Sequence, residues 1–400
     1  MDINTKKKIR KVLKFTGKYF RYIELGFKYI FYPFLNLFIN NKEFTSKLNP
    51  EKINRVLIIR HDYVGDMIVT LPTIKYIKTI NPNIIVDVFC SKNNHFILTG
   101  DNNIDNIYIK KNSTLSIMFQ LLRIRKKKYD LIFTTQYLYI TKNGIMTNLA
   151  ASRNTIKLTV GTKSKYKVFF NKLSEIASQQ ETVWLKMLYA ISDTIDTKIL
   201  PESISPYIFI PDESKQNAEN QLNKFQLLEN KKIVGINLSA RKVQNIWTFE
   251  GYLNLIIKIL AKYDDINIIL FSVDDDIEIA KKIKSSLNLN NNNLENRLFI
   301  YPNIRDIKEI SHSLSKTALA ISPDTGFIHI VSAVGTPALG LYGGFGTNTP
   351  QWRPYKVPYI QIEAGIGKDV SDVNPEIVFT NFEELWLNKE NKDFNKVITL

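Results

Sequence analysis

The sequence contains one cysteine, Cys90, and four histidines among its 400 residues. A single cysteine excludes a disulfide framework, and the chain has no CxxC or HExxH pattern that would supply the ligands of a metal site. Acidic residues are also scarce, because 54 lysine and arginine residues outnumber 38 aspartate and glutamate residues and give a formal net charge of +16. We therefore expect a cytoplasmic protein without metal or cofactor that binds anionic partners.

Long apolar runs are missing as well. The apolar stretch at 29–39 has eleven residues, too few to span a bilayer. Residues 1–50 nevertheless hold eleven lysine and arginine residues, and six of them, from Lys7 to Lys28, are spaced by three, four or seven positions with apolar and aromatic residues between them. This pattern predicts a basic amphipathic helix lying on the anionic inner face of the membrane, as in a peripheral membrane protein. A helix packed on the protein's own body is the alternative, and no nucleic-acid motif accompanies the segment.

The length and the 44% hydrophobic content indicate a globular protein of two domains. Short apolar runs alternate with helical patterns, which predicts parallel sheets covered by helices on both faces. We expect an extension at 1–50, a first Rossmann-like domain at 51–205, a linker within 203–211, a second at 206–375, and a C-terminal helix and tail at 376–400. The helix near 375–388 is expected to return to the first domain. Strands are predicted at 55–60, 84–90, 106–109, 130–135, 231–238, 266–272, 297–301, 319–322 and 338–342.

The stretch 319–355 combines a buried strand, a tight turn and a helix start. Asp324, Thr325 and Gly326 follow the strand, and Asp324 or Thr325 can cap the helix that Gly335 ends. The free backbone N–H groups of such a helix start suit a phosphate or diphosphate. An ordinary strand–helix crossover would give the same local pattern.

Two motifs resemble glycosyltransferase family 9, the heptosyltransferases of lipopolysaccharide core synthesis. One is the run from Ser322 to Gly326 with His329 and Gly335, and the other is 56–60 with Gly65 and Asp66. The resemblance implies a GT-B fold, in which two Rossmann-like domains face each other across a cleft. It also implies inverting transfer of heptose from ADP-heptose to a lipid-linked oligosaccharide of the lipopolysaccharide core of a Gram-negative cell.

The resemblance further assigns roles to residues. Asp66 matches the family's catalytic base, which would take the proton of the acceptor hydroxyl. His61, Asp62 and Gly65 lie on the same acceptor-side loop, and His61 and Asp62 are back-up candidates for the base. His329 is a candidate donor contact that could also simply pack. Without the resemblance, an aspartate that opens a helix is more often a cap.

Further donor-binding candidates follow two strands of the second domain. Ser239, Arg241 and Lys242 come after the strand at 231–238, where hydroxyl and cationic groups could bind a diphosphate. Members of the family carry a phosphate-binding lysine at the position of Asn245, so Arg241 or Lys242 would have to replace it. Asp274 or Asp275 follows the strand at 266–272, where ribose contacts are common.

Three hypotheses follow. The first is a heptosyltransferase that uses ADP-heptose. The second keeps the chemistry with another nucleotide sugar, a hexose or an N-acetylhexosamine, which Asn245 favours. The third is a non-catalytic, membrane-docked nucleotide-sugar binder, which the retained Asp66 and the turn at 324–326 argue against.

Overall fold

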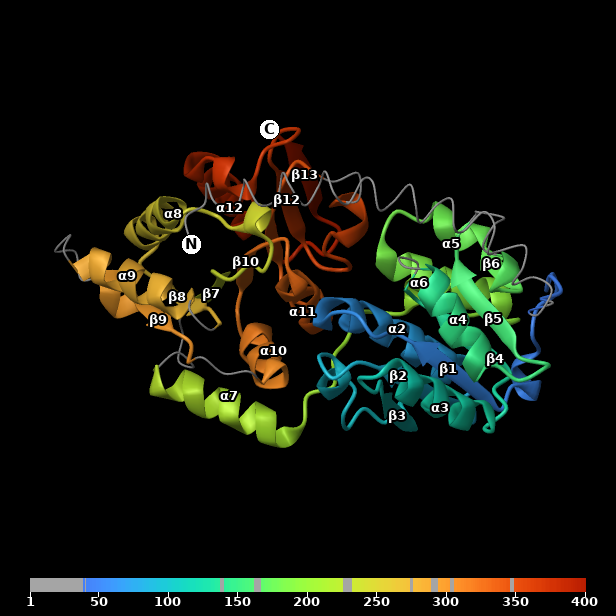
Figure 1. Cartoon of the computed structure of the whole chain (residues 1–400). Helices are drawn as coiled ribbons and strands as arrows, with labels where there is room; N and C mark the ends of the chain where they lie inside the picture. Colours follow the sequence, from blue (N-terminus) through green and yellow to red (C-terminus); the bar gives the residue numbers. More distant parts are fainter. Residues whose placement is uncertain are drawn as a thin grey trace.

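The computed structural model describes residues 39, 41–136, 140–161, 167–225, 232–273, 276–288, 294–302, 306–345 and 349–400. The predicted basic helix within residues 1–50 lies almost entirely outside these ranges, and so do Asp274 and Asp275. The described chain forms two α/β lobes, each built on a parallel sheet (Figure 1). This arrangement confirms the predicted fold class.

The first lobe has a six-stranded sheet in the order β3-β2-β1-β4-β5-β6. Its strands are β1 (Arg55–Ile59), β2 (Ile85–Cys90), β3 (Asn106–Ile109), β4 (Leu131–Thr134), β5 (Ile156–Val160) and β6 (Lys172–Ser174). Its helices are α2 (Val64–Ile80), α3 (Thr114–Arg125), α4 (Ile140–Ala150), α5 (Glu175–Gln179) and α6 (Val183–Thr194). The sequence patterns predicted β1 to β4 and missed β5 and β6.

Both faces of this sheet are covered, as the continuous apolar runs require. Along β1, Val56 and Ile58 join the hydrophobic cluster that contains α2 and α6 residues. The alternate residues Leu57 and Ile59 join a second cluster with residues of α3 and α4. The loop that leaves β1 therefore starts from a strand that is fixed on both sides.

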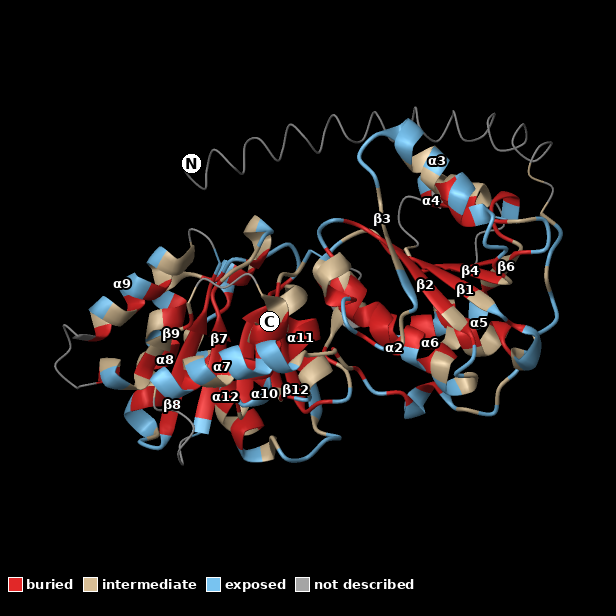
Figure 2. Cartoon of the chain, turned by 90° about the horizontal axis from the view of Figure 1, so that it is seen from below, coloured by how far each residue is buried: buried red, intermediate tan, exposed pale blue. Residues whose placement is uncertain are grey.

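The second lobe has a seven-stranded parallel sheet in the order β13-β12-β11-β10-β7-β8-β9. Its strands are β7 (Lys232–Asn237), β8 (Ile266–Phe271), β9 (Leu298–Ile300), β10 (Leu319–Pro323), β11 (Ala338–Tyr342), β12 (Tyr359–Glu363) and β13 (Asn395–Thr399). Its helices are α7 (Asp212–Lys224), α8 (Phe249–Lys262), α9 (Ile277–Asn288), α10 (Ile307–Ser315), α11 (Gly326–Val334) and α12 (Pro375–Asn388). Figure 2 shows β7 and β8 of this sheet buried between the helices, whereas the edge strand β13 is largely exposed.

The expectation that the C-terminal helix returns to the first lobe is wrong. Helix α12 packs against α8 and against β11 and β12 of the second lobe. Its Phe382 and Leu385 are fully buried in that lobe's core. The chain then adds β13 as an edge strand beside β12, so the apolar face of α12 finds its partner locally.

The lobes meet where α2 of the first contacts α11 of the second (Figure 1). One hydrophobic cluster runs through this junction and includes Met67 of α2 and Ile330 and Val331 of α11. Each of these helices follows the carboxyl end of a central strand, β1 or β10. The junction therefore brings together the two strand ends at which a ligand site is expected.

Candidate active site

Arg60 organises the loop that follows β1. Its Nε donates to Asp62 Oδ1 (2.8 Å) and its Nη2 to Asp66 Oδ1 (2.5 Å). Its Nη1 donates to the carbonyl of Thr135 (2.9 Å), and the side chain is buried. A buried guanidinium with its donors in a fixed plane holds two carboxylates at set positions. Asp66 thus has a fixed place in the first turn of α2.

The neighbours of Asp66 have shifted acid–base properties. Burial raises the pKa of Asp62 to about 6, with the charge of Asp66 adding to the rise and Arg60 opposing it. Burial lowers the pKa of His61 to about 4, helped by the charge of Lys110. His61 Nε2 lies 3.1 Å from Asn143 Oδ1. This loop therefore presents a neutral imidazole at neutral pH, beside a carboxyl group that ionises less readily than an exposed aspartate.

The lobes touch through two glycines at the starts of α2 and α11. A Cβ atom added to Gly65 would lie 2.8 Å from Cα of Gly326 and 3.0 Å from Cδ2 of His329. A side chain at either position would push the backbones apart, so glycine permits this approach. As a result, the N-termini of two helices point to one region, and their free N–H groups create a positive potential there.

His329 lies beside this contact in an aromatic environment. Its ring is 5.7 Å from Trp184 of the first lobe and 5.6 Å from Trp352, centroid to centroid. Its side chain is buried, and its Nδ1 has no hydrogen-bond partner within the described residues. Burial lowers its pKa to about 4, although the nearby charge of Asp66 raises it. His329 is thus a neutral residue of the lobe junction.

The turn after β10 is held by amide and hydroxyl groups. Thr325 caps α11, because its side chain accepts from the N–H of Phe327 (3.3 Å). Asn237, at the end of β7, donates to Ser322 Oγ (3.0 Å) and to Thr325 Oγ1 (3.3 Å). Gly335, with φ of 81°, ends the helix as predicted. These bonds fix the helix start and its N–H groups.

Asn245 holds Asp324 in this turn. Its Nδ2 donates to the Asp324 carbonyl (2.5 Å) and lies 3.3 Å from Asp324 Oδ2. Burial raises the pKa of Asp324, whereas the charge of Lys242 and the bond from Asn245 lower it. In addition, the Arg241 guanidinium lies 4.5 Å from the ring centroid of Tyr63, across the lobe junction. Lys242 and Arg241 are therefore near the turn, as the sequence suggested.

The structure brings most of the predicted residues to one junction. These are Asp66, Gly65 and Asp62 from the first lobe and Arg241, Lys242, Asp324, Thr325, Gly326 and His329 from the second. Ser239 lies at the edge of this group, where its Oγ accepts from the N–H of Val273 (2.9 Å). Among the described residues, no group of three or more His, Cys, Asp or Glu could hold a metal ion.

The sequence analysis did not predict that Arg60 and Asn245 hold site residues in place, and it did not identify Asn237 or Trp184 at all. Arg60 sits two residues before Asp62, so an arginine ending a buried strand beside two aspartates was the available signal. No local pattern marked Asn237 or Trp184, because their partners lie far away in the chain.

Comparisons with known proteins agree on one family. The model of glycosyltransferase family 9 (heptosyltransferase) matches residues 121–376. The lipopolysaccharide core heptosyltransferase OpsX of Haemophilus influenzae is 24% identical over 296 residues, which are 71% of this chain and 78% of that protein.

Two solved structures share the fold. A family 9 glycosyl transferase from Veillonella parvula gives a TM-score of 0.70 at 16% identity, covering 86% of this chain and all of that one. The ADP-heptose lipopolysaccharide heptosyltransferase II of E. coli gives 0.62 at 17% identity, covering 84% and 99%.

Proposed function

Because the chain belongs to glycosyltransferase family 9, we propose that this glycosyltransferase moves heptose from ADP-heptose to a lipopolysaccharide core acceptor. The reaction proposed is a single displacement with inversion that needs no metal ion. The observation that carries this proposal is the contact between Gly65 and Gly326. It places Asp66 next to the helix start that suits the donor's diphosphate.

The proposed reaction begins with the acceptor hydroxyl. Its oxygen attacks the anomeric carbon of the donor sugar while its proton passes to the carboxylate of Asp66. The bond between that carbon and the diphosphate oxygen breaks, and the diphosphate keeps the electron pair. The N–H groups of α11 and the cations Arg241 and Lys242 would stabilise the new negative charge. Arg60 would keep Asp66 aimed at the acceptor.

We assign the acceptor to the first domain, 51–205, and the donor to the second, 206–375. Lys110 and Lys142 support an acidic acceptor, since both charges act on His61. Neither lysine has an ion-pair partner within the described ranges. His61 and Asp62 would then border the acceptor.

A membrane-bound acceptor would require the enzyme to work at the inner face of the plasma membrane. In the parts of the chain that the structure describes, no helix has the length and apolar character needed to cross a bilayer. The basic residues of 1–50 support peripheral binding to anionic lipid from the cytoplasmic side.

Another donor remains the second candidate because of Asn245. It occupies the place where the family carries a lysine, and it bonds to Asp324 instead of offering a cation. A site that has exchanged a phosphate-binding cation for an amide could serve a different nucleotide sugar. Lys242 supplies a positive charge near Asp324, and for this reason we favour ADP-heptose as the donor.

Calorimetry with ADP, UDP, GDP and CMP tests the donor site. We expect ADP to bind best and the Asp324→Ala variant to lose that binding, because Asp324 fixes the turn. Preference for UDP or GDP would replace ADP-heptose by another donor while keeping the reaction. Absence of binding for all four would overturn the proposed function.

Asp66→Asn tests the base. The amide keeps the shape and can still contact Arg60, but it cannot accept the proton, so we expect kcat to fall by at least about 100-fold. ADP affinity should stay within about threefold, because the donor lies on the other lobe. Asp62→Asn is the matched control on the same arginine and should retain most activity. Full activity in Asp66→Asn would assign the base elsewhere, with Asp62 next in line.

A further inference from the structure

Helix α3 has apolar residues on two sides, and the fold uses only one of them. Leu121 and Ile124 are buried, and with Ile117 they pack against the first lobe's sheet. Leu115, Phe119 and Leu122 instead remain exposed, at 66%, 58% and 36%. Spacings of four and three place these three side chains on one stripe of the helix. Figure 2 shows α3 at the rim of the lobe with much of its outer surface exposed.

The stripe is surrounded by positive charge. Between 106 and 129 the chain has no acidic residue and seven basic ones, Lys110, Lys111, Arg123, Arg125, Lys126, Lys127 and Lys128. None of the seven forms an ion pair within the described part of the chain. At about 100° per residue, Arg123 and Arg125 lie on opposite sides of the stripe and Lys126 continues its line.

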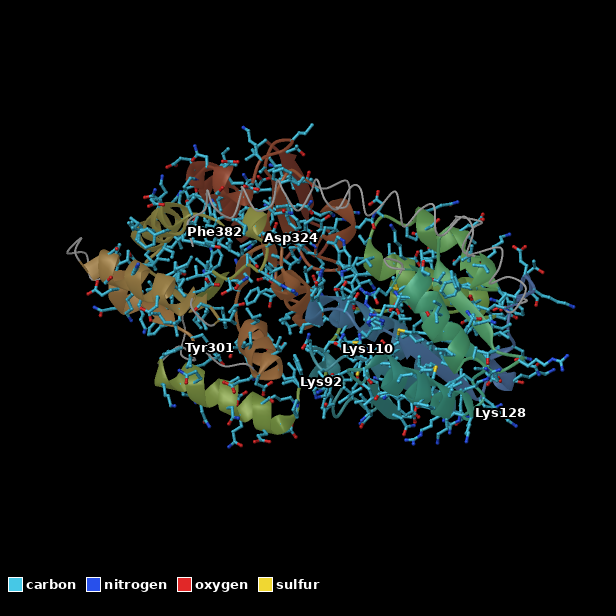
Figure 3. The ribbon with its side chains drawn as sticks, viewed as in Figure 1. Lys92, Lys110, Lys128, Tyr301, Asp324 and Phe382 are labelled. Atoms are coloured by element: carbon cyan, nitrogen blue, oxygen red, sulfur yellow. The ribbon has the colours of Figure 1, made fainter. Side chains whose placement is uncertain are left out.

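The basic run is also held in place. Lys128 has φ of 55°, which turns the chain from α3 toward β4. The next residue, Tyr129, is buried, and its hydroxyl donates to Asp87 Oδ2 (2.5 Å). Figure 3 shows Lys110 near the middle of the molecule and Lys128 at the far end of the first lobe. The surface therefore runs from the acceptor side of the lobe to its outer end.

We propose that the outer face of α3, made of Leu115, Phe119 and Leu122 with the basic run 123–128, docks on an anionic lipid bilayer. Apolar side chains flanked by lysine and arginine are the composition of helices that lie in a membrane interface. A second copy of this chain, or its own basic segment 1–50, would bring like charges together. Of these three partners, only an anionic bilayer offers both an apolar interior for the three exposed side chains and negative charge for the lysines and arginines.

The proposed docking surface adds a membrane contact to the proposed function. It rests on that function only in assuming a lipid-linked acceptor. Docked through α3, the first lobe, to which we assign the acceptor, would lie against the bilayer that carries a lipid-linked acceptor. It also differs from attachment through residues 1–50, since a distinct helix makes the contact.

A single dye can report on this surface. The sole cysteine, Cys90, is buried, and burial raises the pKa of its thiol to about 12, so a thiol-reactive dye should label an introduced surface cysteine selectively. We would label full-length Phe119→Cys with an environment-sensitive fluorophore. Leu387→Cys, 82% exposed on the second lobe, is the matched control. Both would be titrated with vesicles of phosphatidylglycerol mixed with phosphatidylcholine, and with phosphatidylcholine alone.

We expect a blue shift at position 119 with the anionic vesicles only, and none at position 387. A Leu115→Ser, Leu122→Ser double variant and a separate Lys126→Glu, Lys127→Glu, Lys128→Glu variant should each lower vesicle partition by about tenfold or more. Both change exposed side chains, and unfolding curves and ADP calorimetry confirm that they fold.

Three results would overturn the proposal. The first is an unchanged emission wavelength of the dye at position 119 while the protein binds vesicles, and the second is an equal shift of that wavelength with neutral vesicles. The third is a shift caused by protein concentration alone, which would indicate self-association. Failure of all four nucleotides to bind would reject the proposed function but leave a positive dye result, and hence the docking surface, intact.

Discussion

At the scale of single residues, a buried arginine and a buried histidine set the charge of the candidate site. Arg60 compensates two carboxylates at once, which allows Asp62 and Asp66 to approach each other. His329 has no such partner within the described residues, so the low-dielectric surroundings keep it neutral. His329 therefore makes the stability of the junction sensitive to pH.

His329→Phe gives a pH-dependent prediction. The pKa of His329 in the folded protein is about 4, below its value of 6.5 when exposed. Because the folded protein disfavours the protonated imidazole, the free energy of unfolding has its full value above pH 6.5. It decreases as the pH falls from 6.5 to 4. The wild type should therefore lose about 3 kcal/mol of unfolding free energy that the phenylalanine variant keeps.

Urea unfolding at pH 7.5, 6, 5 and 4 would measure this difference. His61 also has a lowered pKa, but it is present in both proteins and cancels in the comparison. Parallel pH profiles for the two proteins would show that His329 is not buried in solution as described.

At the scale of elements, α2 and α11 form the lobe junction, and their first turns touch. The contact depends on glycine in both helices, Gly65 and Gly326, at positions where a side chain would meet backbone. Beyond the glycines, apolar residues of both helices, such as Met67 and Ile330, pack in the hydrophobic cluster that spans the two lobes. The junction is therefore more sensitive to small added volume at these two positions than elsewhere on the helices.

Gly65→Ala should be more damaging than Gly326→Ala. The first places a Cβ atom 2.8 Å from Cα of Gly326, the second only 3.3 Å from N of Gly65. Alanine itself favours helix, so any loss comes from the contact. We expect Gly65→Ala to lower the unfolding free energy by about 2 kcal/mol and Gly326→Ala by clearly less. Denaturant unfolding with small-angle scattering would reveal both the loss and any separation of the lobes. The reverse order would show that the glycines do not meet in solution.

At the scale of the whole molecule, the lobes are joined by an apolar cluster with polar contacts at its edge. Trp184 stacks on Tyr355 with 6.2 Å between ring centroids. Around them, Arg353 pairs with Glu181, and Lys356 donates to the carbonyl of Glu202. All three contacts join the segment after β11 to the first lobe around α6, so this segment is a second connection besides the linker.

The Glu181–Arg353 pair should add little to stability. Its side chains are 71% and 23% exposed, so water and salt screen the attraction. A double-mutant cycle with alanine should give a coupling below about 1 kcal/mol that shrinks further at high salt. A coupling above about 2 kcal/mol would mean that this ion pair, rather than apolar packing, holds the lobes together.

The sequence anticipated most strands of both sheets and missed β5, β6, β12 and β13. Strands such as β1 and β8 are buried on both faces, so their apolar runs are continuous and easily seen. β6 has three residues and β13 is a largely exposed edge strand, so neither has an apolar pattern. The destination of α12 was mispredicted because an amphipathic face does not specify the partner that covers it.

The sequence by itself determined the two parallel sheets, the turn at 324–326 and the candidate base, since local periodicity and motif residues encode each of these. Only the tertiary structure decided that Gly65 meets Gly326, that Asn245 holds Asp324, and that α3 keeps an apolar stripe exposed. The physical reason is how far apart in the sequence the interacting residues lie. Strand and helix patterns arise from neighbouring residues, whereas these contacts and exposures depend on how elements far apart in the chain pack together.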